Sequence, residues 1–484
     1  MAVRAGILLL FGAINAAAQI HATPMAGRWF PSEAGALGRD LDESFRSAEQ
    51  RSGVRTPRRG LTALIVPHAG LRYSGVVAAG AYRLIDRKPR VALVLAFSHN
   101  APVQGVVTVK LDRYESPGGS VPVASEVTRD LGFPVVDEPS VCDHSLENQL
   151  PFLRRALPDI AIVPLYVGRM SEAQLAAAAG KLAARVRGGD LLIASSDFTH
   201  HGKAYGYTPF PEDDKLPARL RERAEQAFEA IGSLDVATFD RHLESTGDTI
   251  CGRGPIRLLM ATLAAAHGDR VYMTKTDYLT SADIAGSDRA LSVGYGALAF
   301  YPAASFQVGP AAQRILLDHA RATLLAAMGE RSATAPALFP AGGFDQRTGA
   351  FVTIRKNKEL RGCVGTLSPR SGLLATIADR TRAAARSDPR FRPMAAADMP
   401  VSLEISLLSP LRLLTRWQSW RPGQGAVLTL GDAGGLLLPQ VATEMGWTRE
   451  QFLEGLSRKA GLAPAAYRDK RAKLYVFEAQ VFGE

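Results

Sequence analysis

The sequence is poor in cysteine, and its cysteines lie far apart. Its 484 residues contain three, Cys142, Cys251 and Cys363, with no C-x-x-C pair. Disulfide frameworks and zinc ribbons need more cysteines at short spacing, so both are excluded. No apolar run reaches the ~20 residues that cross a bilayer, which excludes a transmembrane anchor. Internal repeats and low-complexity tracts are also lacking.

Positive charge is present without being concentrated. The formal net charge is +10, and arginines cluster only around residues 51–59 and 380–392. No aromatic residues interleave a basic stripe, so nucleic-acid binding by the C-terminal part is the weakest functional alternative. A hydrophobic content of 46% predicts folded domains. The chain length predicts two or three of them.

Two interpretations of the N-terminus stay open. Arg4 precedes an apolar stretch, residues 5–14, and an A-x-A site follows it, which is the layout of a secretory signal over residues 1–18. Met25 stands directly before the first segment that looks folded, AGRWFP, so a misplaced start explains the same residues. In either case residues 1–23 form an extension or signal peptide that precedes the first domain.

Residues 24–302 predict an α/β domain. Short apolar runs rich in β-branched residues alternate with amphipathic helical stretches such as 171–186 and 254–268. Continuous apolar strands separated by helices indicate a mostly parallel sheet flanked by helices. The predicted strands are residues 61–66, 91–97, 161–167, 190–195 and a closing strand at 290–301.

Residues 303–310 contain proline and glycine without periodicity and predict a linker. Residues 311–484 then predict a smaller α+β domain with an antiparallel sheet, because a helix at 311–328 is followed by strands of period two. Thr448 and Gln451 form a capping box before a further helix. The predicted strands are 350–356, 402–409, a hairpin over 426–439, and 473–482.

Histidines follow three of the predicted strands of the first domain. His68 lies in PHAG, His99 in SHN, and His200 in SSDFTHHG. Because ligands gather at the carboxyl ends of strands in α/β sheets, we expect these side chains to share a pocket. Cys251 lies in the turn TICGRGP before a helix, whose positive end favours the thiolate.

This set of residue types suits a transition metal. Neutral imidazole binds iron, copper and zinc, and thiolate shifts the preference toward softer metals. Asp197 can orient a ligand or act as a base, and His200 can exchange protons near neutral pH. One member of the doublet His200-His201 is expected to face the pocket, while its neighbour points away or hydrogen-bonds locally.

The segment DHSLENQLPF is a further candidate for the lining of the same pocket. On a helix, Asp143 and Glu147 share a face and His144 lies beside them, so His144 and Glu147 are candidates for substrate binding. The alternative is a capped helix with a solvated acidic face.

The segment FVTIRKNKELRGCVGT of the second domain contains a candidate active site. Arg361 lies near Cys363 and can activate its thiol, which makes Cys363 a catalytic candidate and Arg361 a substrate-binding candidate. The alternative is a buried strand cysteine beside structural glycines.

These strings resemble two known families joined in one chain. Residues from about 24 to 302 resemble the Memo family, called AmmeMemoRadiSam system protein B in prokaryotes, and residues from about 311 to 484 resemble the AMMECR-type family, AmmeMemoRadiSam system protein A. The first resemblance rests on AGRWFP, VPHAGLRYSG, SHN, DHSLENQLPF, SSDFTHHG, TICGRGPI and SVGYGALAF. The second rests on FVTIRKNKELRGCVGT, SDPRFRP, LEISLLSP and GLLLPQVA.

The Memo resemblance implies a fold similar to class III extradiol dioxygenases, which use non-haem iron. It implies that His68, His99 and Cys251 bind an iron or copper ion, and that Asp197 and His200 line the same pocket. Cys251 stands where the dioxygenase pattern would have a carboxylate.

The resemblance also implies a metal-dependent redox protein that works with a radical SAM protein and takes a peptide or small-molecule substrate. It favours a cytoplasmic location, with export as the alternative if residues 1–18 are cleaved. A non-catalytic scaffold with a vestigial metal pocket, which binds a peptide or the partner, is the alternative function.

Overall fold

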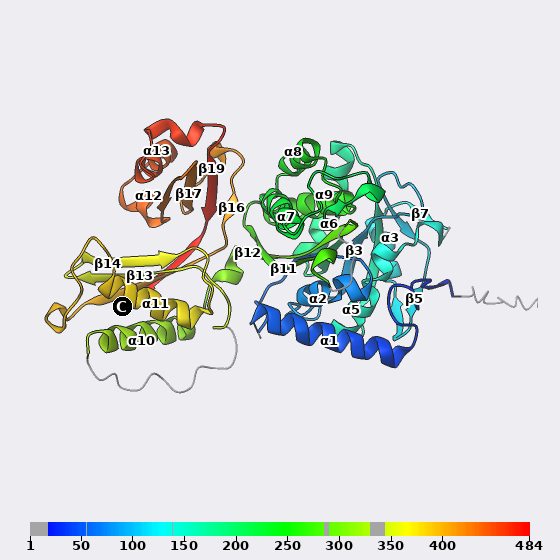
Figure 1. Cartoon of the computed structure of the whole chain (residues 1–484), viewed down its shortest axis with the longest axis horizontal. Helices are drawn as coiled ribbons and strands as arrows, with labels where there is room; N and C mark the ends of the chain where they lie inside the picture. Colours follow the sequence, from blue (N-terminus) through cyan, green and yellow to red (C-terminus); the bar gives the residue numbers. More distant parts are fainter. Residues whose placement is uncertain (1–17, 55, 138, 285–289, 330–343) are drawn as a thin grey trace, which may run out of the picture.

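The computed structural model of the chain describes residues 18–54, 56–137, 139–284, 290–329 and 344–484. Residues 1–17, which carry nearly all of the predicted signal sequence, lie outside the described residues. Figure 1 shows two lobes side by side, the first coloured from blue to green and the second from yellow-green to red. No helix in the described part of the chain has the length and apolarity needed to cross a bilayer.

The first lobe is built on a nine-stranded sheet in the order β10-β12-β2-β9-β3-β8-β4-β7, with β11 paired to β12. The four central strands β2, β9, β3 and β8 are parallel to one another, and they are the first four apolar runs predicted from the sequence. The strand bounds are β2 Ala63–Val66, β3 Val91–Ala96, β4 Val106–Val109, β7 Val135–Val136, β8 Ala161–Val167, β9 Leu191–Ser195, β10 His200–His201, β11 Val271–Thr280 and β12 Ser292–Pro302.

The sheet is mixed, which corrects the expectation of a mostly parallel one. β12 runs antiparallel to β2, β10 and β11, and β4 runs antiparallel to β8. β11 ends at Thr280 and β12 begins at Ser292, and the two strands pair directly with each other in antiparallel orientation, so the chain reverses direction between them. The parallel strands β2 and β3, by contrast, are connected through helix α2.

Helices cover both faces of this sheet because successive strand residues point to opposite sides. Leu64 and Val66 of β2 belong to the core under α1, α2 and α5, while Ala63 and Ile65 belong to the core under α6, α7 and α9. The helices are α1 Ala34–Ser52, α2 Leu71–Tyr82, α3 Ser125–Leu131, α4 His144–Glu147, α5 Leu150–Ala156, α6 Glu172–Arg187, α7 Leu216–Gly232, α8 Val236–Thr246 and α9 Arg253–His267.

A small sheet, β1-β5-β6, joins the N-terminal residues to the first lobe. β1 (Ile20–Ala22) pairs with β5 (Arg113–Ser116), which pairs with β6 (Gly119–Pro122). Residues 20–22, which we assigned to the extension before the domain, are therefore part of the packed lobe.

The second lobe contains two four-stranded antiparallel sheets where we expected one. The orders are β14-β13-β15-β20 and β16-β19-β17-β18, and the first sheet carries α10 and α11 while the second carries α12 and α13. The bounds are α10 Pro310–Ala327, β13 Ala350–Lys356, β14 Glu359–Thr366, α11 Leu373–Arg386, β15 Ser402–Leu408, β16 Arg412–Leu413, β17 Gly425–Leu430, β18 Ala433–Leu437, α12 Gln440–Glu444, α13 Arg449–Lys459, β19 Lys473–Phe477 and β20 Ala479–Gly483.

The last predicted strand divides between these two sheets. Residues 473–482 form β19 and then β20, with Glu478 between them, and the backbone N–H of Glu478 donates to Ser409 Oγ. The capping box of Thr448 and Gln451 at the start of α13 is confirmed, because each side chain bonds the other residue's backbone N–H.

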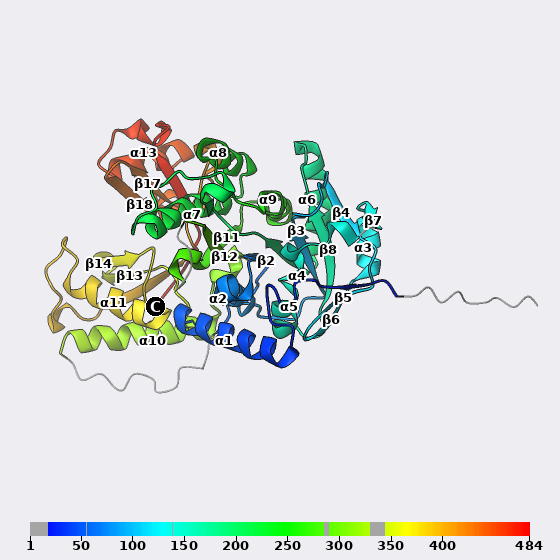
Figure 2. The same ribbon diagram turned by 45° about the vertical axis from the view of Figure 1, so that its right-hand side comes forward.

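Figure 2 shows the two lobes from a second direction. A carboxylate of the first lobe, Asp269, contacts the second lobe. Asp269 accepts hydrogen bonds from Arg421, from Arg412 at 3.5 Å and from Gln424 at 3.4 Å. The Arg412 side chain is 6% exposed, so its charge lies away from water and depends on this carboxylate.

Replacement of Asp269 by alanine is expected to lower the free energy of unfolding by about 1–2 kcal/mol. Removing one partner of a fully buried ion pair destabilises a protein more than this. Here the Asp269 side chain is 32% exposed, so water screens part of the charge left on Arg412. Chemical denaturation measures the change. Asp159→Ala, which breaks an ion pair with Lys88 at the surface, is the control, with an expected change below about 0.5 kcal/mol. Equal effects of the two variants would contradict the role given to Asp269.

Candidate metal centre

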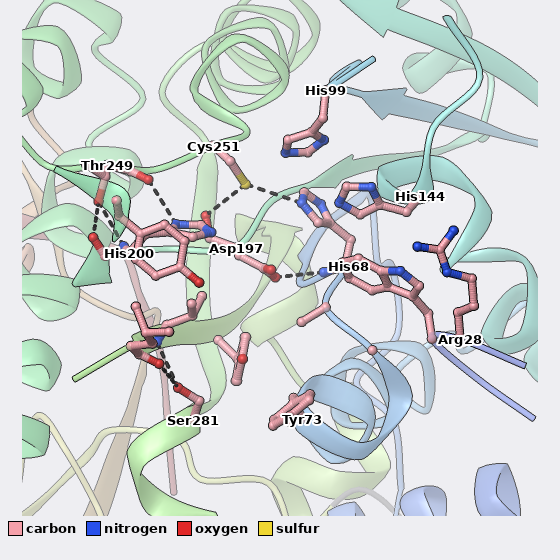
Figure 3. A pocket seen from close by; sticks show the side chains of 17 residues that line it. Arg28, His68, Tyr73, His99, His144, Asp197, His200, Thr249, Cys251 and Ser281 are labelled. Atoms are coloured by element: carbon pink, nitrogen blue, oxygen red, sulfur yellow. Dashed lines mark hydrogen bonds between the residues drawn. The ribbon is translucent and has the colours of Figure 1, made fainter. Parts of the chain in front are cut away.

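A cavity of about 800 Å³ opens at the carboxyl ends of β2, β9 and β3 (Figure 3). His68 follows β2, His99 follows β3, and Asp197 and His200 follow β9. All four line this cavity together with Cys251, which directly precedes α9. The structure therefore brings together the five residues predicted from the first domain for metal binding and proton exchange.

Three of these residues present ligand atoms to one point. The ligand atoms of His68, His99 and Cys251 lie within 4.8 Å of one another. The sulfur of Cys251 lies 3.3 Å from Nε2 of His68. His200 lines the same cavity but lies outside this group of mutually close ligand atoms.

Glycine 252 allows Cys251 to approach the sheet. A Cβ atom at Gly252 would lie 2.4 Å from Cβ of Ser196 and 2.5 Å from the carbonyl oxygen of Ser195. Any larger residue would push the turn away from the end of β9. The backbone N–H of Gly252 donates to Ser196 Oγ at 3.0 Å, which fixes the approach.

His68 is fixed by a chain of buried hydrogen bonds. Its Nδ1 lies 3.0 Å from Ser195 Oγ, and this hydroxyl gives its own proton to the carbonyl oxygen of Ser145. Ser195 therefore accepts at His68, so Nδ1 of His68 carries the proton and Nε2 keeps its lone pair. Gln149 Nε2 also donates to Ser195 Oγ at 3.0 Å, and Tyr82 Oη donates to Gln149 Oε1 at 2.8 Å.

His99 and His200 are held in the same way by different partners. Nδ1 of His99 lies 2.9 Å from a carboxylate oxygen of Asp143. Nδ1 of His200 lies 3.1 Å from the carbonyl oxygen of Thr249, which can only accept. In each ring Nδ1 donates, and Nε2 is the nitrogen that keeps a lone pair for a ligand.

Burial favours the neutral form of three imidazoles at the cavity, those of His68, His200 and His144. It lowers the pKa of His68 well below the usual value, lowers that of His200, and brings the pKa of His144 to about 4. Burial alone would raise the pKa of Asp143, but the hydrogen bond from His99 and the nearby His144 outweigh it and lower the pKa to about 2. Asp143 is thus ionised and fixes the orientation of His99.

The pKa of Asp197 is shifted in the opposite direction from that of Asp143. Burial raises its pKa to about 7, against the lowering effect of hydrogen bonds from the backbone N–H groups of His68 and Ala69. A carboxyl group with this pKa exchanges protons near neutral pH. Its position in the cavity agrees with the base or orienting role predicted from the sequence.

The pKa of Cys251 corrects an expectation. The start of α9 was expected to favour the thiolate, but burial raises the pKa of the thiol and the negative charge of Asp197 raises it further. Desolvation outweighs the partial charge of the helix end here.

The histidine doublet divides as predicted. His200 lines the cavity, whereas His201 is fully buried and its Nε2 lies 3.0 Å from the carbonyl oxygen of Phe210. The two rings point to opposite sides because they are successive residues of the short strand β10.

The segment 143–147 is only partly placed as expected. His144 lines the cavity and stacks on both Trp29 and His99, with ring centroids 4.4 Å away in each case. The structure does not place Glu147, the second substrate-binding candidate of this segment, at the cavity. Glu147 is fully buried away from the cavity, where it accepts hydrogen bonds from Thr23 and, at 2.9 Å, pairs with His21. Asp143 does not share a helix face with Glu147 because it caps α4 in an extended conformation.

Cys363 and Arg361 lie on β14 of the second lobe, outside this cavity. The guanidinium of Arg361 donates to Asp398 at 3.2 Å and to the carbonyl oxygen of Arg392 at 2.8 Å. Sγ of Cys363 accepts a hydrogen bond from the hydroxyl of Thr353 at 3.3 Å. The catalytic and substrate-binding roles of the pair stay predictions.

Several cavity residues were missed by the sequence interpretation. Arg28 and Tyr73 line the cavity (Figure 3). Trp29, Tyr205 and Tyr295 are further aromatic residues of its lining. Arg28 and Trp29 lie in AGRWFP, which we treated only as a folded segment. The four aromatic residues come from a turn, from α2, from the 3-10 helix Lys203–Tyr205 and from β12. They share no spacing pattern in the sequence, so only the fold places these side chains at one cavity.

The fold and the cavity define a two-lobed α/β protein with an imidazole and thiol cluster at the carboxyl edge of its sheet. The family model described as Memo-like protein matches residues 22–299, and the model described as AMMECR1 matches residues 317–482. The chain belongs to the Memo family and carries an AMMECR1 domain after the Memo domain.

Relatives match part of this chain along nearly their whole length. A MEMO1 family protein of Thermococcus onnurineus is 30% identical over 293 residues, which is 57% of this chain and 97% of the relative. Protein MEMO1 of Xenopus tropicalis is 29% identical over 289 residues, which is 56% of this chain and 95% of the relative. Among solved structures, the uncharacterized protein PH0010 of Pyrococcus horikoshii is 31% identical and covers 35% of this chain and 90% of its own, with a TM-score of 0.33.

The hydrogen bonds behind the three rings predict their tautomers. In metal-free protein, His68, His99 and His200 are expected to carry a proton on Nδ1, which two-bond ¹H–¹⁵N correlation spectra of histidine-labelled protein detect. Ser195→Ala removes the acceptor of His68 alone and is expected to change only the His68 signal. Ser47→Ala, on the exposed surface of α1, is the matched control and is expected to change none of them. A proton on Nε2 of His68 in the unsubstituted protein would contradict the assignment.

Proposed function

We propose that this chain is a fused AmmeMemoRadiSam B/A protein that binds non-haem iron or copper in a dioxygenase-like pocket and acts as a redox protein. The observation that carries the proposal is the cluster of His68, His99 and Cys251, whose ligand atoms lie within 4.8 Å of one another. Its support is that two unprotonated imidazole nitrogens and one sulfur face the same cavity.

The donor set fits the proposed metals. Neutral imidazole suits iron and copper, and a thiolate adds the softness that copper favours. Ser195 and Asp143 hold the two rings from behind, as partners of metal-binding histidines do. Three protein ligands leave further coordination positions open toward the cavity. When bound, iron or copper would supply one-electron redox chemistry.

The residues around the cluster can move protons and position a substrate. Asp197, with its pKa raised to about 7, can take or give a proton beside His68. His200 is held by Thr249 so that its Nε2 is available as an acceptor. Trp29 and Tyr295 offer flat apolar surfaces, which favour a substrate with a planar or apolar part and exclude water around it.

A radical SAM protein is the proposed partner, and the proposed location is the cytoplasm. Both rest on the resemblance of the two parts of the chain to the A and B proteins of one system. The domains at 22–299 and 317–482 lie in one polypeptide, which keeps them together when a third component binds.

A second candidate function, a non-catalytic scaffold, has one observation in its favour. Tyr73, Tyr205 and Leu291 line the cavity and are 39%, 42% and 41% exposed, which is high for large apolar side chains. Such a rim suits the docking of a peptide or a partner. Capture of the radical SAM partner by a Cys251→Ser variant, with no turnover under any redox condition, would favour the scaffold.

Metal analysis of anaerobically purified protein tests the main proposal. Protein loaded with iron or copper is expected to hold about one ion per chain. The double variant His68→Ala/His99→Ala is expected to lose at least about tenfold in affinity, because it removes two of three ligands. His267→Ala, at the far end of α9, is the matched control and is expected to bind as the unsubstituted protein does. Unchanged affinity in the double variant would contradict the proposal.

A further inference from the structure

A second cavity lies beside the metal pocket and shares one wall with it. It has a volume of about 940 Å³, and His99 lines both cavities. The loop 97–104 after β3 and residues 167–169 at the end of β8 form its floor, and α8 and α9 form the rest of its wall. It therefore lies at the same carboxyl edge of the sheet, one strand further along.

Residues at the start of α9 and directly before it also line both cavities. Cys251 faces the metal pocket, and Arg253 and Gly254, two and three residues later, line the second cavity. The two cavities thus meet along His99 on one side and residues 251–254 on the other.

The second cavity has positive charge that the protein does not neutralise. Arg169 and Arg253 line it with exposed side chains, and neither side chain has a hydrogen bond or ion pair with any residue that the structure describes. A third arginine, Arg257, is engaged by Asp240 at 2.9 Å. Two acids also line the cavity, Asp240, which is taken up by Arg257, and Glu244, which is exposed on α8.

We propose that this second cavity binds the oxyanion of a small molecule, a phosphate or a carboxylate. Two guanidinium groups with unused donors match the geometry of such groups and bind them in a bidentate manner. The first turn of α9 adds its partial positive charge on the same side. The site goes beyond the proposed function because it needs no metal, and through His99 it places the bound anion directly beside the metal pocket.

Titration of metal-free protein at low ionic strength tests the site. Inorganic phosphate and succinate are the two probes, followed by ³¹P line broadening and by calorimetry. At least one of them is expected to bind. Arg169→Ala/Arg253→Ala is expected to weaken that binding about tenfold or more, since charge-assisted hydrogen bonds are lost. Glu244→Gln removes a negative charge from the cavity and is expected to strengthen it about two- to fivefold.

Matched controls distinguish specific binding in this cavity from nonspecific attraction of anions to a positively charged protein. Arg314→Ala/Arg416→Ala removes two exposed arginines outside both cavities and is expected to leave binding unchanged. Binding of phosphate alone supports a phosphorylated ligand, and binding of succinate alone supports a carboxylate. The proposal would be overturned if neither probe binds. It would also be overturned if the two double variants lose the same affinity for the anion. His68→Ala, which changes a residue that lines the metal pocket and not the second cavity, is expected to lose metal and keep the anion, so failure of the metal site and failure of this site are distinguishable.

Discussion

The candidate centre depends on the hydrogen bonds behind its imidazole rings. Ser195, Asp143 and Thr249 each occupy Nδ1 of one histidine, so each ring has a single nitrogen left with a lone pair. Because the acceptors are buried or part of the backbone, the rings cannot turn over without leaving a buried polar group unpaired. The same burial keeps His68 and His200 neutral, which is the state in which imidazole binds a metal.

The topology of the sheet explains why these residues meet. The strands β2, β9 and β3 are neighbours and parallel, so the loops that follow them emerge at one edge. Gly252 then lets the start of α9 reach this edge with Cys251 on one side and Arg253 on the other. The edge is therefore shared by the metal pocket and by the arginine-lined cavity.

The sequence predicted the parts of the molecule in which local pattern and chemistry agree. The four central strands are continuous apolar runs that end in polar residues, and this pattern placed His68, His99 and His200 correctly. It failed where a side chain's direction depends on distant contacts. Glu147 is the type of residue expected in a cavity, but it bonds His21 of β1 and Thr23, which follows β1, and no local pattern shows these contacts. Likewise, β12 runs antiparallel to β2, and its continuous apolar composition, which resembles that of the parallel strands, does not reveal this direction.

The central claim is that two imidazoles and one thiolate of this chain hold the same metal ion. X-ray absorption spectroscopy of the iron- or copper-loaded protein tests it most directly. If His68, His99 and Cys251 share one ion, the first coordination shell contains one sulfur and at least two nitrogen donors. The sulfur contribution is then lost in Cys251→Ser and kept in Cys142→Ser and Cys363→Ser. A shell without sulfur in the unsubstituted protein, or one unaffected by Cys251→Ser, would contradict it.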